Sequence, residues 1–161
     1  MLRAVIVLWI ALAVAAPAAA QNSQRDHEAT IAAATAYLDA YQAFDLERLE
    51  TLYAEEATFD DPTSLHLAGV NGAPFVFRGR DAILNGIRYW MQNSVTSLHY
   101  DVEEVYESSG RVVFVGAATA NGPSRWRFRI VTIVTIENGL VVEHRDYTDY
   151  WGATQVQPAN P

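Results

Sequence analysis

Apolar residues recur at helical spacing in three segments of the chain. The segments cover residues 27–44, the residues that follow Asp45, which is suited to cap a helix, and residues 83–91. The inward positions are Ile31, Ala34, Leu38, Tyr41, Leu46, Leu49, Leu52, Tyr53, Ile83, Ile87, Trp90 and Met91. This pattern predicts three amphipathic helices, and the break at Phe44-Asp45 joins the first two as a hairpin.

Beyond Asn93 the pattern changes to that of β-strands. Long segments rich in β-branched and aromatic residues are separated by turn residues, of which Asn138-Gly139 is the strongest signal. The predicted strands are Leu98–Tyr106, Arg111–Ala120, Arg125–Glu137 and Leu140–Trp151. Helices followed by strands predict an α+β domain, a cone-shaped fold in which a strongly curved antiparallel sheet of four or more strands wraps three N-terminal helices.

The Asn138-Gly139 pair also predicts how the last two strands pair. A two-residue hairpin loop sets Glu137 opposite Leu140, and counting back sets Ile133 opposite His144 and Val131 opposite Asp146. His144 and Asp146 then share one face of the sheet with Val131. They are predicted to lie close enough to form a hydrogen bond.

The other face of this predicted hairpin carries a large apolar surface. Its members are Trp126, Phe128, Ile130, Val134, Ile136, Tyr147 and Trp151. Helices can cover only one face of the sheet, and so much apolar surface is not left in water. We therefore expect a homodimer in which the outer sheet face is covered by a second subunit.

The first 20 residues predict export. Arg3 precedes an apolar run from Ala4 to Ala16, and Pro17 and three alanines follow. A run of about 13 apolar residues is short for a membrane span, so we expect a signal peptide cleaved after Ala20, with an uncleaved anchor as the alternative. The predicted mature chain is one domain, residues 21–154, with a flexible tail at 155–161, and its location is secreted or periplasmic.

The amino-acid composition excludes several kinds of reaction and partner. The chain has no cysteine and no lysine, so thiol, Schiff-base and Walker-type phosphate chemistry are excluded. A formal net charge of −8 argues against nucleic acids and anionic membranes as partners. The four histidines show no metal-binding spacing, and we expect neither a metal nor another cofactor.

Three stretches carry a resemblance to a known family: YLDAYQAFDLERLETLYAEEATFDDP from Tyr37 to Pro62, FRGRDAI, and ENGLVVEHRDYTDYW near the end. Together they resemble the SnoaL-like branch of the nuclear transport factor 2-like superfamily. That superfamily includes ketosteroid isomerases, polyketide cyclases and limonene epoxide hydrolases. The resemblance implies a cone-shaped fold around a small-molecule pocket.

The resemblance to ketosteroid isomerase implies an acid–base site. It matches Asp61 with the base that shuttles the proton, Tyr37 with the tyrosine that donates to the oxyanion, and Tyr53 with a supporting tyrosine. The second oxyanion donor, a protonated aspartic acid, falls at Val131. Half of that oxyanion hole is therefore missing here.

The resemblance to limonene epoxide hydrolase implies a different role for the last strand. It matches Asp146 with the aspartate that activates water, but the partner arginine and second aspartate fall near Gly116 and Ala118. The two positions that match the water-positioning residues of that enzyme are occupied by Phe59 and Asp61 in this sequence. Epoxide hydrolysis by the same scheme is therefore not expected.

Each candidate also has a purely structural interpretation. Asp61 is suited to shape the turn before Pro62, Tyr37 to fill the core, and Asp146 to form a buried polar pair with His144. His66 is expected at the pocket mouth and Trp90 in its wall. Two hypotheses follow: an exported protein that binds a small apolar molecule and transfers a proton with Asp61 as base, assisted by Asp146 and Tyr37, or a non-catalytic binding or dimerisation module.

Overall fold

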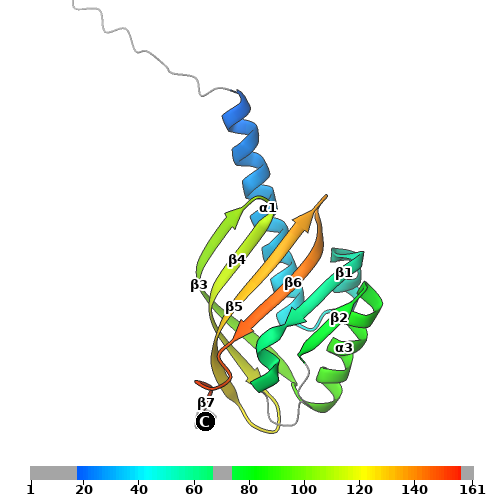
Figure 1. Ribbon diagram of the computed structural model, residues 1–161, viewed down its shortest axis with the longest axis vertical. Coiled ribbons are helices and arrows are strands. Elements are labelled where there is room, and N and C mark those ends of the chain that lie inside the picture. Colours follow the sequence, from blue (N-terminus) through cyan, green and yellow to red (C-terminus); the bar gives the residue numbers. More distant parts are fainter. Residues whose placement is uncertain (1–17, 67–73, 157–161) are drawn as a thin grey trace, which may run out of the picture.

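The computed structural model describes residues 18–66 and 74–156, with side chains from residue 23 onward except that of His66 (Figure 1). Its elements in chain order are α1 (Ala18–Gln42), α2 (Leu46–Leu52), β1 (Tyr53–Asp61), the 3-10 helix η1 (Pro62–His66), β2 (Phe75–Arg78), α3 (Arg80–Asn93), β3 (Ser97–Ser108), β4 (Arg111–Asn121), β5 (Trp126–Glu137), β6 (Leu140–Thr148) and β7 (Thr154–Gln155). The three predicted helices and four predicted strands are confirmed, although the last strand ends at Thr148 instead of Trp151, and Tyr53 begins β1 instead of belonging to the second helix.

The strands form one curved, open sheet in the order β2-β1-β6-β5-β4-β3, and β7 adds to β5. Neighbouring strands are antiparallel except for β1 and β6, which run parallel, so the sheet is mixed rather than purely antiparallel as predicted. The difference arises because residues 53–61 form a full strand, whereas the sequence pattern predicted strands only beyond Asn93.

The helices lie against the inner, concave face of the sheet (Figure 1). Buried side chains from both layers form one hydrophobic core, which includes Tyr37 and Leu49 from the helical hairpin, Ile83 from α3, and Phe59 and Val134 from the sheet. Burial of these apolar side chains supplies the main driving force for folding. The chain is therefore an α+β cone, as predicted.

Local signals in the sequence set the turns of this fold. The side chain of Asp45 accepts a hydrogen bond of 3.0 Å from the backbone N–H of Arg48, the N-cap predicted for α2. Asn138 and Gly139 have φ values of 52° and 79°, and Glu137 pairs with Leu140. The hairpin turn between β5 and β6 is thus confirmed.

The predicted pairing beyond this turn is wrong by one residue. Ile136 pairs with Val141 and Thr135 with Glu143, so Val142 is left as the extra residue of a β-bulge. Beyond the bulge, His144 pairs with Val134 instead of Ile133, and Asp146 pairs with Thr132 instead of Val131.

The bulge changes which side chains face inward. Val141, His144 and Asp146 are all buried on the concave side, although His144 follows Val141 by three positions. Side chains alternate along a regular strand, so if the strand continued from Val141 without a bulge, His144 would face outward. The bulge therefore turns His144 and Asp146 toward the helices.

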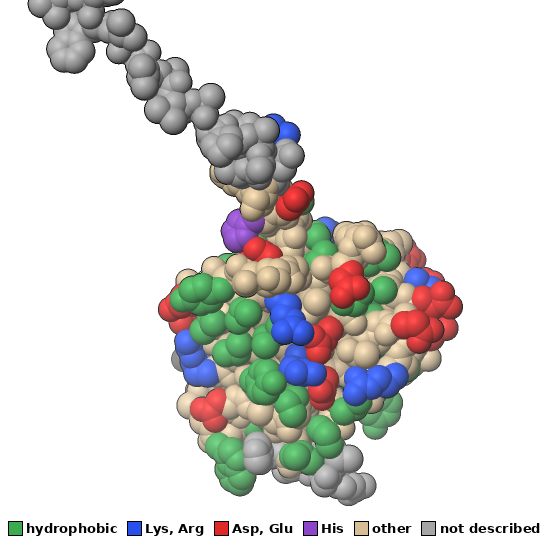
Figure 2. Space-filling view, turned by 45° about the horizontal axis from the view of Figure 1, so that its top comes forward, with side chains coloured by type: hydrophobic (Ala, Val, Ile, Leu, Met, Phe, Trp, Pro, Cys, Tyr) green, Lys and Arg blue, Asp and Glu red, His purple; other side chains and the backbone are tan. Residues whose placement is uncertain are grey.

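The same correction applies to the outer sheet face. Phe128, Ile130, Val134 and Ile136, which were predicted to lie outside, belong to the inner core or pack against it. The outer face presents instead the partly exposed Val113, Val115, Val131 and Ile133 and the exposed Tyr147. Figure 2 shows that hydrophobic side chains on the visible surface lie among clusters of arginine and acidic side chains.

A second bulge interrupts the antiparallel pairing of β3 with β4. Glu103 is the extra residue of this bulge, and it lies close to Gly116 of β4. A Cβ atom on Gly116 would lie 2.1 Å from the backbone oxygen of Asp101, far inside van der Waals contact. Glycine is therefore required there for the strands to approach this closely.

The N-terminal part of α1 projects beyond the sheet (Figure 1). Residues 1–17 of the predicted signal peptide and the predicted tail from residue 157 lie outside the described residues, and α1 begins at Ala18. In the described part of the chain, no helix combines the length and the apolar character needed to cross a membrane. Export, cleavage and the domain limits at 21–154 remain predictions.

Candidate functional site

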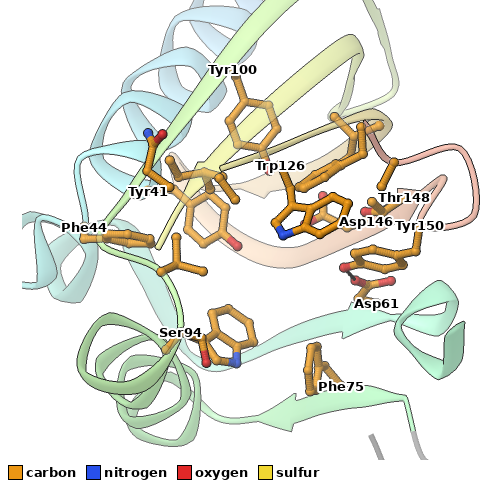
Figure 3. Close-up of a pocket in the computed structure, with 18 of the residues that line it drawn as sticks. Tyr41, Phe44, Asp61, Phe75, Ser94, Tyr100, Trp126, Asp146, Thr148 and Tyr150 are labelled. Carbon is orange, nitrogen blue, oxygen red and sulfur yellow. Dashed lines mark hydrogen bonds between the residues drawn. The ribbon is translucent and has the colours of Figure 1, made fainter. Parts of the chain in front are cut away.

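A cavity of about 930 Å³ opens on the concave side of the sheet, between α1, α3 and the ends of the strands (Figure 3). Its walls are largely aromatic and aliphatic. The lining residues are Tyr41, Phe44, Phe59, Asp61, Phe75, Tyr89, Trp90, Ser94, Val95, Leu98, Tyr100, Ala120, Asn121, Ser124, Trp126, Phe128, Ile130, Asp146, Thr148, Tyr150, Trp151 and Ala153. This size is suited to a small organic molecule.

Asp61 ends β1 at the edge of the cavity, and its carboxylate makes four hydrogen bonds. Oδ1 accepts from the backbone N–H groups of Thr63 and Ser64, each at 3.0 Å, and from the Thr63 hydroxyl at 2.6 Å. Oδ2 accepts from the hydroxyl of Tyr150 at 2.6 Å. Oδ1 therefore shapes the turn into η1, and Oδ2 contacts Tyr150 at the cavity.

The surroundings of Asp61 change its proton affinity. Its side chain is almost completely buried, and this desolvation raises the pKa of the carboxyl group above its usual range. The hydrogen bonds from Thr63 and Tyr150 act in the opposite direction, and the nearby charge of Asp146 raises the pKa again. A raised pKa makes Asp61 a stronger base than an ordinary surface aspartate.

Asp146 enters the cavity from β6. Its Oδ1 accepts a hydrogen bond of 2.5 Å from the hydroxyl of Thr132, the residue directly across the β5–β6 pair. Its Oδ2 lies 2.9 Å from Nε2 of His144, an ion-pair distance, although the direction of approach makes no hydrogen bond. Asp146 is 4% exposed, and it faces the same cavity as Asp61 (Figure 3).

Behind Asp146 lies a fully buried chain of polar side chains. The hydroxyl of Tyr37 is hydrogen-bonded to Nδ1 of His144 and to the hydroxyl of Tyr53. The imidazole of His144 stacks on Phe59, with ring centroids 4.3 Å apart. Burial raises the pKa of both tyrosines, which stay protonated and hold the imidazole in one orientation.

The structure brings together only part of the predicted site. Asp61, Asp146, Phe59 and Trp90 line the cavity. Tyr37, Tyr53 and His144 do not line it; they form the chain behind Asp146. Val131 lies on the outer sheet face, because the neighbouring Ile130 and Thr132 face the core and the bulge at Val142 pairs Asp146 with Thr132 instead. The side chain of His66 lies outside the described residues.

Tyr41 is a lining residue that sequence reasoning did not assign to the site. It follows Tyr37 by one turn of α1, and the two rings stack with centroids 6.1 Å apart. Its hydroxyl points into the cavity (Figure 3) and makes no hydrogen bond within the described part of the chain. The helical stripe that contains both tyrosines was the only available signal.

Tyr150 and Trp126 were also missed as site residues. Tyr150 lies just after β6 and contacts Asp61, and Trp126 begins β5 at the cavity wall. Among the described residues, no three His, Asp or Glu side chains gather closely enough to hold a metal ion. The polar side chains in the cavity lining include two carboxylates, several hydroxyl groups and the amide of Asn121.

The chain belongs to the SnoaL-like domain family, whose model matches residues 34–144. This segment contains the first helix from Ala34, most of the cavity wall with Asp61, and β6 as far as His144, whereas Asp146 and Tyr150 lie beyond its end. A search among curated proteins finds no significant match. The resemblance noted from the sequence is thus confirmed at the level of the family.

Solved structures share the fold at low sequence identity. A SnoaL-like polyketide cyclase candidate from Shewanella putrefaciens aligns with a TM-score of 0.67 and 22% identity, over 89% of this chain and 94% of that one. An epoxide hydrolase of Mycobacterium tuberculosis similar to limonene epoxide hydrolase aligns at 0.61 and 19%, over 78% and 86%. A ketosteroid isomerase candidate from Kribbella flavida aligns at 0.59 and 17%, over 84% and 85%. At these identities the similarity establishes the fold alone.

Proposed function

We propose that this protein binds a small, largely apolar molecule in the cavity and catalyses a proton transfer, of the kind that isomerases and cyclases perform, without a cofactor. The observation that carries the proposal is the position of Asp61 and Asp146 in the wall of one mostly apolar cavity. Buried carboxylates in such a setting are costly for folding, and they are typical of acid–base sites.

Asp61 serves as the base in this proposal. Its raised pKa supports the role, since a base works best when its proton affinity approaches the working pH. Oδ2 accepts one hydrogen bond, from Tyr150, and a carboxylate oxygen has a second lone pair that can take a proton from the ligand. Oδ1 remains engaged with Thr63 and Ser64, which keeps the carboxylate in place.

Tyr41 serves as the hydrogen-bond donor to the oxygen on which negative charge develops. The sequence suggested Tyr37 for this role, but the hydroxyl of Tyr37 is occupied by His144 and Tyr53 away from the cavity. Tyr41 has a free hydroxyl that faces the ligand space, and burial raises its pKa, which keeps it protonated. Tyr37 then acts as a positioning residue that fixes His144 behind Asp146.

The test follows the proton itself. Hydrophobic ketones with exchangeable α-hydrogens, including steroid enones, are incubated with the protein in D₂O, and exchange is followed by NMR. We expect exchange faster than in buffer, and loss of that exchange in Asp61→Asn with ligand binding retained. Binding without exchange for every ketone would support the second candidate function, a non-catalytic binding protein, which the missing counterpart of the second oxyanion donor at Val131 favours.

Two further proposals concern the whole molecule. Export by a signal peptide cleaved after Ala20 rests on the residue pattern at 1–20, and sequencing the N-terminus of the protein from a bacterial host tests it. Homodimer formation rests on the apolar side chains of the outer sheet face, Val113, Val115, Val131, Ile133 and Tyr147, which no helix of the described chain covers.

A further inference from the structure

We infer that the ligand of the cavity is an organic cation: an apolar body that carries a protonated or quaternary amine. This inference rests on the proposed function in one respect, that the cavity binds a small molecule, and it adds the charge of that molecule. Three features carry it: the absence of basic side chains from the described part of the cavity wall, the two carboxylates, and the aromatic rings around them.

Within the described part of the chain, basic side chains are absent from the lining: none of these lining residues is Arg, Lys or His. Arginines of the sheet are paired with acidic residues instead: Arg127 with Asp101, Arg129 with Glu103, and Arg145 with Glu143 at 2.8 Å. A carboxylate or phosphate ligand would find no cationic partner in the cavity wall and would meet two like charges.

The two carboxylates have too little positive charge near them. The partners of Asp61 are hydroxyl and backbone N–H groups, which are neutral. Asp146 has Thr132 and the imidazole of His144, and a fully protonated His144 would balance only one of the two aspartates. When both aspartates are ionised, at least one negative charge is therefore uncompensated in a mostly apolar cavity, where its attraction for a cation is stronger than in water.

The walls offer faces to which organic cations bind. Trp126, Tyr150 and Phe128 lie near the aspartates, and Trp90 and Phe75 lie across the cavity with ring centroids 5.4 Å apart. Figure 3 shows Trp126, Tyr150, Asp61 and Asp146 around one hollow. Aromatic faces attract cations, indole most strongly, and weakly hydrated ammonium groups are recognised in this way.

The hydroxyl of Tyr41 is available to a ligand. It has no hydrogen-bond partner among the described residues, and the side chain lines the cavity. A polar substituent on the cation can therefore hydrogen-bond to this hydroxyl.

A matched pair of probes tests the charge alone. Phenyltrimethylammonium and tert-butylbenzene have nearly the same shape, and only the first is charged. Their binding is followed by NMR through the indole N–H signals of Trp90, Trp126 and Trp151. We expect the cation to bind roughly tenfold or more tightly than its neutral counterpart. We expect this preference to fall in Asp61→Asn, Asp146→Asn and Trp126→Leu, and to persist in the control Asp101→Asn on the outer face.

The outcomes separate this inference from the proposed function. Equal or tighter binding of tert-butylbenzene, or a cation preference that survives both aspartate substitutions, would overturn the cation inference and leave the binding cavity intact. If hydrophobic ketones bind but the ammonium probe does not, the cation inference fails alone. If neither probe nor any ketone perturbs the three indole signals, the proposed binding function fails as well.

Discussion

Tyr150 donates a hydrogen bond of 2.6 Å to Oδ2 of Asp61, and so connects the segment after β6 to the end of β1. The opposite oxygen of the same carboxylate organises the turn into η1. Thr63 extends this connection, since its hydroxyl bonds to Asp61 and also accepts from the backbone N–H of Thr148 at 2.8 Å. The position of this carboxylate is therefore determined by residues that are distant in the sequence.

Removing the Tyr150 hydroxyl should raise the pKa of Asp61. The hydrogen bond stabilises the ionised carboxylate, so Tyr150→Phe favours the protonated form. The measurement is the pH titration of the Asp61 side-chain carbon by NMR, with Tyr147→Phe on the outer face as control. An unchanged or lower pKa in Tyr150→Phe would show that this hydrogen bond does not tune the base.

Asp61→Asn should stabilise the protein at neutral pH. Burial raises the pKa of Asp61 in the folded state, so the contribution of this group to stability is fully present below the unfolded pKa of about 3.9 and is lost as the pH rises through the folded pKa. Asparagine resembles the protonated carboxyl, so the advantage in melting temperature should be largest near pH 7 and disappear below about pH 4.

A matched variant on the surface should show the opposite sign. The hydrogen bond and charge of Arg127 lower the pKa of Asp101, so Asp101→Asn removes a stabilising anion at neutral pH. Thermal unfolding of both variants between pH 3 and pH 8 is the measurement. If the change in melting temperature depended on pH in the same way for Asp61→Asn and Asp101→Asn, the conclusion that burial raises the pKa of Asp61 would be contradicted.

Two tyrosines on one face of α1 should differ in their effects. Tyr37→Phe leaves His144 and Tyr53 without a partner in the core, at a cost of about 1–3 kcal/mol in the free energy of unfolding. Tyr41→Phe removes a hydroxyl without a partner and should change stability by less than about 0.5 kcal/mol, while it slows proton exchange in a bound ketone. Urea unfolding and the exchange assay measure the two effects, and equal losses of stability would contradict the distinction.

Gly116→Ala should destabilise the sheet. The added Cβ would meet the backbone oxygen of Asp101 at 2.1 Å, so β3 must shift, at a cost of about 1–3 kcal/mol. Gly152→Ala is the matched control, because its Cβ would meet the carboxylate of Asp149, a side chain that can rotate away. Similar melting temperatures for the two variants would argue against a close approach of β3 and β4.

The outer sheet face should hold two copies together. Light scattering at micromolar concentration should give twice the chain mass, and Val131→Glu should give the single mass because it places a charge within the apolar patch. Thr51→Glu on the exposed side of α2 serves as the control. A single mass for the unmodified protein would remove the dimer proposal and would leave the cavity untouched.

The sequence predicted those parts of the fold that local chemistry determines. Asp45 capped α2, and Asn138-Gly139 formed the β5–β6 turn, because each depends on a few neighbouring residues. The parallel pairing of β1 with β6 could not be predicted in this way, since it joins segments far apart in the chain and has no local signal.

Only part of the candidate site could be predicted from the sequence, because the rest depends on how distant segments pack together. The family resemblance identified Asp61 and Asp146, and both line the cavity. It also favoured Tyr37 over Tyr41, but these tyrosines share one helical stripe, and the packing of α1 on the sheet decides which of them reaches the cavity. Valines 141 and 142 gave no sign of which residue leaves the regular pairing, so the faces of β5 were assigned incorrectly relative to His144 and Asp146.

The bulge at Val142 determines which charged side chains of β6 face the hollow. If the same residues paired regularly with β5, without the bulge, alternation along β6 would point Glu143, Arg145 and Tyr147 at the helices and turn His144 and Asp146 to the outer face. The strand would then present the guanidinium of Arg145 to the hollow where it now presents the carboxylate of Asp146. The sign of the charge in the hollow therefore depends on the register of this hairpin and not on the residue types of β6 alone.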